Sequence, residues 1–311
     1  MSIRNLNSFQ NTLFQEALYL SYQKKYNENK IYSDISLNLD KKNLLNLTIE
    51  KNKDNNLKSL NFYGNPIFLN NSDESIKLKL FEKFKKILNL YEIREIIFKK
   101  KLSLNEVEKI SKKEFSNEII VENYIDLNKS LVEIRKNFSK GHKHILNKDY
   151  KDLVYEVFDY KNYKKNQIEE MRELHKKVSG KVTRSIESWK VNEDMILNKK
   201  GFLIKVKEND KLISYSFIFK NSEEAIYFSS CTLRDKFIQY KNITHKSIWK
   251  CISYLKDLNC KKFHLGISKT LYSKKIIDQK RKNIERFKSS FGGEKKIFAI
   301  FDQLPINYKD L

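Results

Sequence analysis

One short segment near the end of the chain has a lysine four residues before a pair of glycines. It reads Phe287-Lys288-Ser289-Ser290-Phe291-Gly292-Gly293-Glu294, in a chain of 311 residues that has only seven glycines. Glycine accepts positive φ angles and lets a backbone or a ligand come close, so the pair predicts a tight turn beside a close neighbour. The group available for chemistry just ahead of that turn is the amine of Lys288.

A histidine upstream is the second candidate. His264 lies in the strand-like run Lys262-Phe263-His264-Leu265-Gly266. Its reference pKa is near neutrality, so it could act as a general base. A partly buried strand histidine bonded to backbone is an equal alternative. The other histidines have no metal-ligand spacing, so no metal site is predicted. Cys231 is not expected to act as a nucleophile, because nothing in its sequence neighbourhood would activate the thiol.

The elements that must position these residues follow from hydrophobic spacing. In the second half we expect a basic helix ending at 290 and strands at 153–158, 202–207, 212–219, 225–231, 262–265 and 296–301, with further helices at 166–178, 184–197 and 243–258. Polar turns at 208–211 and 221–224 join the middle strands into an antiparallel meander. The first half is expected to hold helices at 8–26 and 73–90 and strands at 31–39, 44–50, 58–69, 94–99 and 119–127. A basic helix over 128–148 joins the two halves.

The order of these elements is that of the GNAT acyltransferase fold, and several motifs resemble the Fem-type (FemAB-like) aminoacyl and acyl transferases. The motifs are Tyr227-Phe228-Ser229-Ser230, Ile248-Trp249-Lys250, Lys262-Phe263-His264-Leu265-Gly266 and Phe287-Lys288-Ser289-Ser290-Phe291-Gly292-Gly293. The resemblance implies a mixed α/β fold of two tandem GNAT-like halves. It places a degenerate N-terminal half at 1–127, a basic bridging helix at 128–150 and a C-terminal half at 151–311. No long heptad run is present, so no coiled-coil arm is expected.

The resemblance also implies a reaction, the transfer of an aminoacyl or acyl group to an amine, such as one on a peptidoglycan peptide or an amino sugar. Lys288 then corresponds to the lysine that stabilises the oxyanion, with Phe287 beside the transferred group. Phe291, Ser229 and Ser230 are candidate substrate-binding residues. Many relatives have an aspartate on the penultimate strand where this chain has His264.

The donor depends on the stretch from Gln239 to Lys246, which precedes and begins the helix at 243–258. CoA-dependent GNAT proteins cradle pyrophosphate there with a glycine-rich loop, but this stretch has no glycine. Aminoacyl-tRNA is therefore favoured over acyl-CoA, and no separate cofactor is expected. Lys241, Thr244 and Lys246 are the candidate donor-binding residues.

The net charge of +23 is compatible with tRNA or an anionic membrane surface as a partner. Only eight of the 62 basic residues are Arg, a pattern that AT-rich coding also produces. A CoA-dependent acyltransferase of surface-glycan metabolism and a non-catalytic RNA-binding module therefore stay open as alternatives. We expect a cytoplasmic protein without a transmembrane segment, because the start of the chain is polar and its three cysteines lack metal spacing.

Overall fold

The computed structural model describes residues 17–26, 30–40, 43–54, 58–61, 88–93, 95–103 and 116–301, with a few single positions between 75 and 107. The strands are β1 (Lys30–Asp40), β2 (Asn43–Asn52), β3 (Lys58–Asn61), β4 (Glu95–Leu102), β5 (Ser116–Asp126), β6 (Leu153–Phe158), β7 (Gly201–Glu208), β8 (Lys211–Lys220), β9 (Glu224–Thr232), β10 (Lys262–Ser273) and β11 (Glu294–Phe301). The helices are α2 (Ala17–Tyr26), α5 (Leu131–Lys136), α6 (Lys140–Asn147), α7 (Gln167–Ser179), α8 (Ile186–Leu197), α9 (Arg234–Gln239), α10 (Ile243–Asp257) and α11 (Gln279–Ser289).

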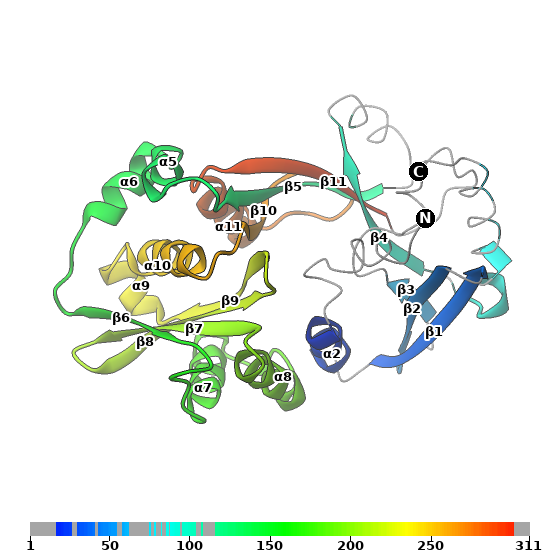
Figure 1. The fold of residues 1–311 in the computed structure, drawn as a ribbon, viewed down its shortest axis with the longest axis horizontal. Helices are drawn as coiled ribbons and strands as arrows, with labels where there is room; N and C mark the ends of the chain where they lie inside the picture. The colour runs from blue at the N-terminus through cyan, green and yellow to red at the C-terminus, as the bar shows by residue number, and fades with distance from the viewer. Residues whose placement is uncertain are drawn as a thin grey trace.

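The strands form one mixed sheet that runs through both halves of the protein (Figure 1). Its order is β1-β2-β3-β4-β11-β5-β10-β9-β8-β7-β6. β11, from the end of the chain, pairs antiparallel with both β4 and β5, and β5 also pairs with β10. The last strand therefore joins the two halves. The predicted mixed α/β fold is confirmed. Among the helices whose first and last residues the structure describes, α10 is the longest, with 15 residues.

The meander of β7, β8 and β9 forms where the sequence predicts it, because both of its turns have suitable residues. Asn209 and Asp210 have φ angles of 46° and 65°, as a two-residue hairpin turn requires. In the second turn the side-chain oxygen of Asn221 accepts hydrogen bonds from the backbone N–H groups of Glu223 and Glu224, at 2.9 and 2.7 Å. These local bonds fix the register of the strands.

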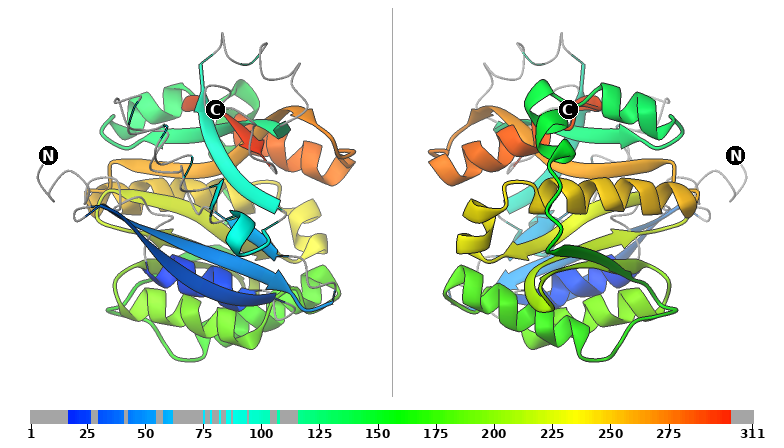
Figure 2. Two further views of the ribbon diagram at one scale, coloured as in Figure 1. Left: turned by 90° about the vertical axis from the view of Figure 1, so that its right-hand side faces the viewer. Right: turned by 90° about the vertical axis from the view of Figure 1, so that its left-hand side faces the viewer.

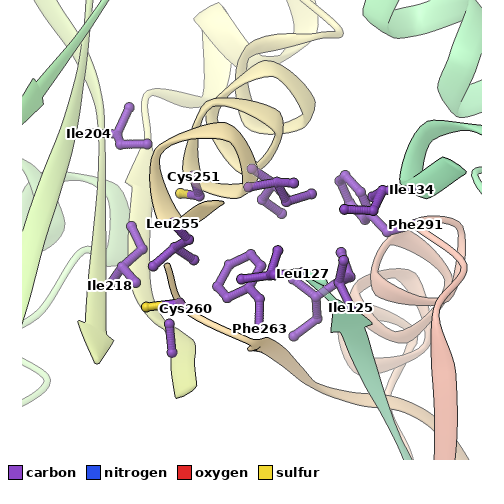
Figure 3. Packing of buried hydrophobic residues seen from close by; sticks show 14 of the residues in the cluster. Ile125, Leu127, Ile134, Ile204, Ile218, Cys251, Leu255, Cys260, Phe263 and Phe291 are labelled. Atoms are coloured by element: carbon purple, nitrogen blue, oxygen red, sulfur yellow. The ribbon is translucent and has the colours of Figure 1, made fainter. Parts of the chain in front are cut away.

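Helices cover both faces of this part of the sheet, with α10 on one face and α7 and α8 on the other (Figures 1 and 2). Successive side chains of β8 point to opposite faces of the sheet, so alternate residues pack against the helices on each face. Tyr215, Phe217 and Phe219 pack against α7 and α8, whereas Ile218 faces the cluster around α10. Figure 3 shows that the α10 cluster extends from Ile218 across the helix to Phe291 in the glycine-containing segment. The segment is thus anchored in the core.

The structure differs from the sequence prediction at three elements. The expected bridging helix over 128–148 is two short helices, α5 and α6, because Ser139 caps a new helix start by accepting a bond from the backbone of His142. β10 continues to Ser273, eight residues beyond the expected end at 265. α9 was not expected. The predicted segments 8–16 and 62–69 and most of 73–87 lie outside the described residues.

Candidate active site

An opening in the sheet separates β9 from β10. These parallel strands pair at three positions only, 224–226 with 262–264, although β9 continues to Thr232 and β10 to Ser273. Each strand has a register shift where the separation begins, at Phe228 against β8 and at Leu265 against β5. Bulges bend a strand and interrupt its ladder, which accounts for the divergence. Beyond the paired positions, the two strands make no ladder hydrogen bonds to each other.

Lys288 lies at this opening, where a glycine makes room for it. Its Nζ is 3.0 Å from the position that a Cβ on Gly266 would occupy, and Gly266 has a φ of 78°. The carbonyl of Lys288 accepts a 2.9 Å hydrogen bond from the side-chain amide of Asn123, which is fully buried. Among the described residues, no carboxylate lies within ion-pair distance of Nζ. Within the described part of the chain, the ammonium group therefore has no direct ion-pair partner, although two carboxylates lie farther away.

Burial lowers the pKa of Lys288 from its usual 10.5, while the nearby carboxylates of Glu122 and Glu285 act in the opposite direction. Glu285 is itself occupied, since it accepts hydrogen bonds from the backbone and hydroxyl of Thr270 and pairs with Arg281. A desolvated cation interacts more strongly with a developing negative charge than a solvated one does. The surroundings of Lys288 therefore suit its ammonium group to stabilise a developing negative charge.

The end of α11 is fixed by an aromatic cluster that includes two histidines. The rings of His142 and His245 are 4.1 Å apart, and His245 packs edge-on against Phe287 at 5.0 Å. Ser290 Oγ lies 3.0 Å from Nε2 of His142, and Phe291 lies 4.3 Å from the same ring. Burial lowers the pKa of His142 to about 3 and that of His245 to about 4. The cluster is therefore neutral and holds the residues that flank Lys288.

Gly292 and Gly293 form the tight turn that the sequence predicts, and the close neighbours are backbone carbonyls. A Cβ on Gly292 would lie 2.3 Å from the oxygen of Asn137, and one on Gly293 would lie 2.4 Å from the oxygen of Tyr124. Both residues have positive φ angles, 64° and 91°. No other residue fits either position, so the pair docks the end of α11 onto β5 and the α5–α6 bridge.

Ser229 of β9 bonds an arginine, Arg184, that no sequence motif marked. Arg184 is 8% exposed and donates to Ser229 Oγ at 3.0 Å and to the hydroxyl of Tyr22 at 2.6 Å. Its guanidinium also lies 4.0 Å above the ring of Trp189. Ser230, the next residue along β9, is exposed. Arg184 thus joins α2 of the N-terminal half to the strand that borders the opening, over a separation of 162 residues.

His264 lies in the last paired position of β10, two residues before Gly266. It is 6% exposed, its Nε2 is 3.3 Å from the carboxylate of Glu224, and its ring packs edge-on against Tyr124 at 4.4 Å. The histidine and Lys262 together hold the pKa of Glu224 at about 2. The predicted base is therefore an imidazole oriented by a carboxylate.

The three candidate donor-binding residues lie at the start of α10. Lys241 is exposed, Thr244 is half-buried, and Lys246 forms an ion pair with Asp149 at 2.8 Å. Asn242 caps the helix without a side-chain bond to it and instead donates to the carbonyl of Lys148. The start of α10 adjoins the glycine-containing segment at 287–294, because His245 contacts Phe287.

All three cysteines are free and buried, and burial raises the pKa of Cys231 to about 12. The described residues contain no group of three or more His, Cys, Asp or Glu side chains that could hold a metal ion. Within the same residues, no helix is long and apolar enough to cross a membrane.

Comparison with known proteins identifies the fold. The chain matches no protein-family model, and no curated protein matches it in sequence. A crystal structure of FemX matches it with a TM-score of 0.65 at 10% identity, over 98% of this chain and 96% of that one. The chain has the fold of a Fem-type, tandem GNAT-like protein. L-PGS from Bacillus licheniformis matches with a TM-score of 0.54 at 13% identity, over 95% and 94% of the two chains.

A tandem GNAT protein from the clavulanic acid biosynthesis pathway matches with a TM-score of 0.52 at 7% identity, over 93% of this chain and 88% of that one. The similarity covers nearly the whole of each chain, so it includes the N-terminal half. The prediction for that half rested only on the order of its helices and strands. The predicted tandem GNAT-like fold is confirmed.

Proposed function

We propose that this protein is an N-acyltransferase that uses the opening between β9 and β10. The observation that carries the proposal is the position of Lys288 Nζ against Gly266, at the point where the two strands have separated. In the reaction, an amine attacks the carbonyl carbon of an activated ester or thioester, and the carbonyl oxygen becomes an oxyanion. Collapse of this intermediate forms the amide and releases the alcohol or thiol. A fixed cation at the oxyanion contributes about 3 to 4 kcal/mol to such a step.

The other residues have separate roles in this proposal. Phe287 packs beside the transferred group, with the buried ring of Phe291 behind it. Ser229 and Ser230 line the acceptor side, where Arg184 fixes the Ser229 hydroxyl. His264 takes the proton that the attacking amine loses. The carboxylate of Glu224, 3.3 Å away, then stabilises the imidazolium.

We propose aminoacyl-tRNA as the donor and an amine of a cell-envelope precursor, a peptidoglycan peptide or an amino sugar, as the acceptor. The glycine-free start of α10 and the net charge of +23 support a polyanionic donor over CoA. Lys241, Thr244 and Lys246 would contact it. The location we propose is the cytoplasm, where charged tRNA is found, with contact to an anionic membrane surface through the basic exterior.

The test compares Lys288→Ala with Lys282→Ala, which removes an exposed lysine from the same helix. Each protein is incubated with charged tRNA or with acyl-CoA and a panel of amines, and mass spectrometry identifies the donor consumed and the amide formed. We expect Lys288→Ala to lose transfer by a factor of about 100 to 1,000 while Lys282→Ala retains it. Full transfer by a folded Lys288→Ala protein would remove Lys288 from the mechanism.

The same experiment distinguishes the donors. Consumption of acyl-CoA alone, together with protection from heat by CoA and not by charged tRNA, would assign the protein to CoA-dependent acyl transfer. Salt-sensitive RNA binding without transfer to any amine would instead indicate a non-catalytic RNA-binding protein.

A further inference from the structure

A hollow lies between α10 and the two bridging helices, apart from the place where β9 and β10 separate. Its volume is about 440 Å³, which is within the range of small-molecule sites. Seven residues from α5, α6, β6 and α10 line it: Arg135, Leu146, Tyr155, Lys246, Trp249, Lys250 and Ser253. The four α10 residues are spaced by three and four positions, so they share one face of that helix. We call this hollow the bridge groove.

The lining of the bridge groove is strongly positive. It contains three cations and no carboxylate. Lys246 pairs with Asp149, a side chain that is 82% exposed, and Arg135 donates to the side-chain oxygen of Asn147. Lys250 is exposed, and no carboxylate among the described residues pairs with it. An anion entering the groove would therefore meet cations that are only weakly neutralised.

Two further features select the kind of anion. The hydroxyl of Tyr155 is buried at the groove and has no hydrogen-bond partner among the described residues, so a ligand with a suitable polar atom would satisfy it. Trp249 lines the groove as well, and its indole offers a surface on which a nucleobase can stack. Phosphate-binding cations, a stacking aromatic group and an unpaired hydroxyl match the three parts of a nucleotide.

The sequence around the groove adds positive charge. Between residues 129 and 148, the bridge has six Lys or Arg residues and one acidic residue, Glu133, which gives a net charge of 6 − 1 = +5. The acid is engaged in the capping box of α5, where it accepts bonds from Ser130. The bridge therefore concentrates part of the overall charge of the protein beside the groove.

We propose that the bridge groove binds a nucleoside phosphate, with the phosphate at Arg135, Lys246 and Lys250 and the base against Trp249. The nucleotide is either free in solution or part of an RNA strand, since both present the same chemistry. Lys246 is also one of the residues that we propose contact the donor, but nucleotide binding in the groove can be measured without acyl transfer, since none of the groove residues lies on β9, β10 or α11.

Tryptophan fluorescence provides the test, since the chain has only two tryptophans and Trp189 is buried on the opposite face of the sheet. The full-length protein is titrated with adenosine monophosphate, with a single-stranded RNA tetranucleotide and with inorganic phosphate. We expect saturable quenching by the two nucleotide ligands and at least tenfold weaker binding of phosphate. Tenfold tighter binding of the RNA would identify a strand as the source, and equal binding would identify a free nucleotide.

Variants connect the signal to the groove. Trp249→Phe should abolish the quenching, Lys250→Glu should weaken binding at least tenfold, and Tyr155→Phe should weaken it about threefold to tenfold. Lys177→Glu, an exposed lysine on α7, carries the same charge change and should bind like the wild type. No saturable quenching by either nucleotide ligand, equally tight binding of inorganic phosphate, or equal weakening by Lys177→Glu would overturn the proposal.

Discussion

The glycine opposite the candidate catalytic lysine offers a sharp test of how Lys288 is positioned. An added methyl group in Gly266→Ala would lie 3.0 Å from Nζ of Lys288, whereas ordinary contacts are 3.4 to 4 Å. The end of a lysine side chain can move, so the ammonium should retreat by roughly half an ångström while the fold adapts. An oxyanion donor must lie within about 2.7 to 3.1 Å of the oxygen, so a shift of this size weakens the contact. We expect kcat/KM to fall about 10-fold to 100-fold.

A matched substitution separates this effect from backbone strain. Gly180 ends α7 with a φ of 73°, close to the 78° of Gly266, but a Cβ on it would have nothing within 4 Å. Both alanine variants should therefore lose about 1 kcal/mol of folding stability, because an L-residue in this region is strained. Chemical denaturation measures that loss. Only Gly266→Ala should lose transfer activity.

A double variant completes the test. Lys288→Met removes the ammonium, so adding Gly266→Ala to it should cause little further loss of activity, in contrast to the loss that Gly266→Ala causes alone. The expected result is strong non-additivity in kcat/KM. Equal activity of Gly266→Ala and Gly180→Ala, or additive effects in the double variant, would refute the placement of Lys288 at the reacting oxygen.

Three further predictions concern residues in the glycine-containing segment at 287–294 or packed against it. The folded-state pKa values of His142 and His245, about 3 and 4, lie below the unfolded value of 6.5, so the unfolded chain binds more protons as the pH falls from 6.5 to 4. Urea unfolding should show a loss of folding stability on the order of 5 kcal/mol over this range, and roughly half of that in His142→Gln. Gly292→Ala would place a methyl group 2.3 Å from the carbonyl oxygen of Asn137. It should lower the melting temperature far more than Gly180→Ala, which calorimetry can measure. If Lys288 acts as an ammonium, kcat/KM should fall as the pH rises through its lowered pKa, and an alkaline limb unchanged in Lys288→Arg would contradict this.

The local elements of the C-terminal half were predictable because their signals are short-range. The apolar spacing of α7 and α10, the alternation along β8 and the polar turn at Asn209 and Asp210 each depend on residues within a few positions of one another. Those segments form within a residue or two of the expected bounds. The scarcity of glycine likewise marked the Gly292-Gly293 turn.

The contacts that make the candidate site were decided by the tertiary structure. Arg184 bonds Tyr22 across 162 residues, and His142 meets His245 although each looks like an ordinary helical residue in the sequence. No local pattern encodes such pairs, because they depend on how distant elements pack. Sequence placed the end of β10 at 265, next to Gly266, yet the strand continues because β5 pairs with it through Ser273.

The sequence by itself therefore determined the order of the elements and, through a resemblance, selected Lys288. Only the fold showed that Gly266 leaves space for the ammonium and that the separation of β9 and β10 opens the sheet beside it. The reason is physical. Periodicity records which residues are buried, whereas the space around a side chain is set by elements that pack from elsewhere in the chain.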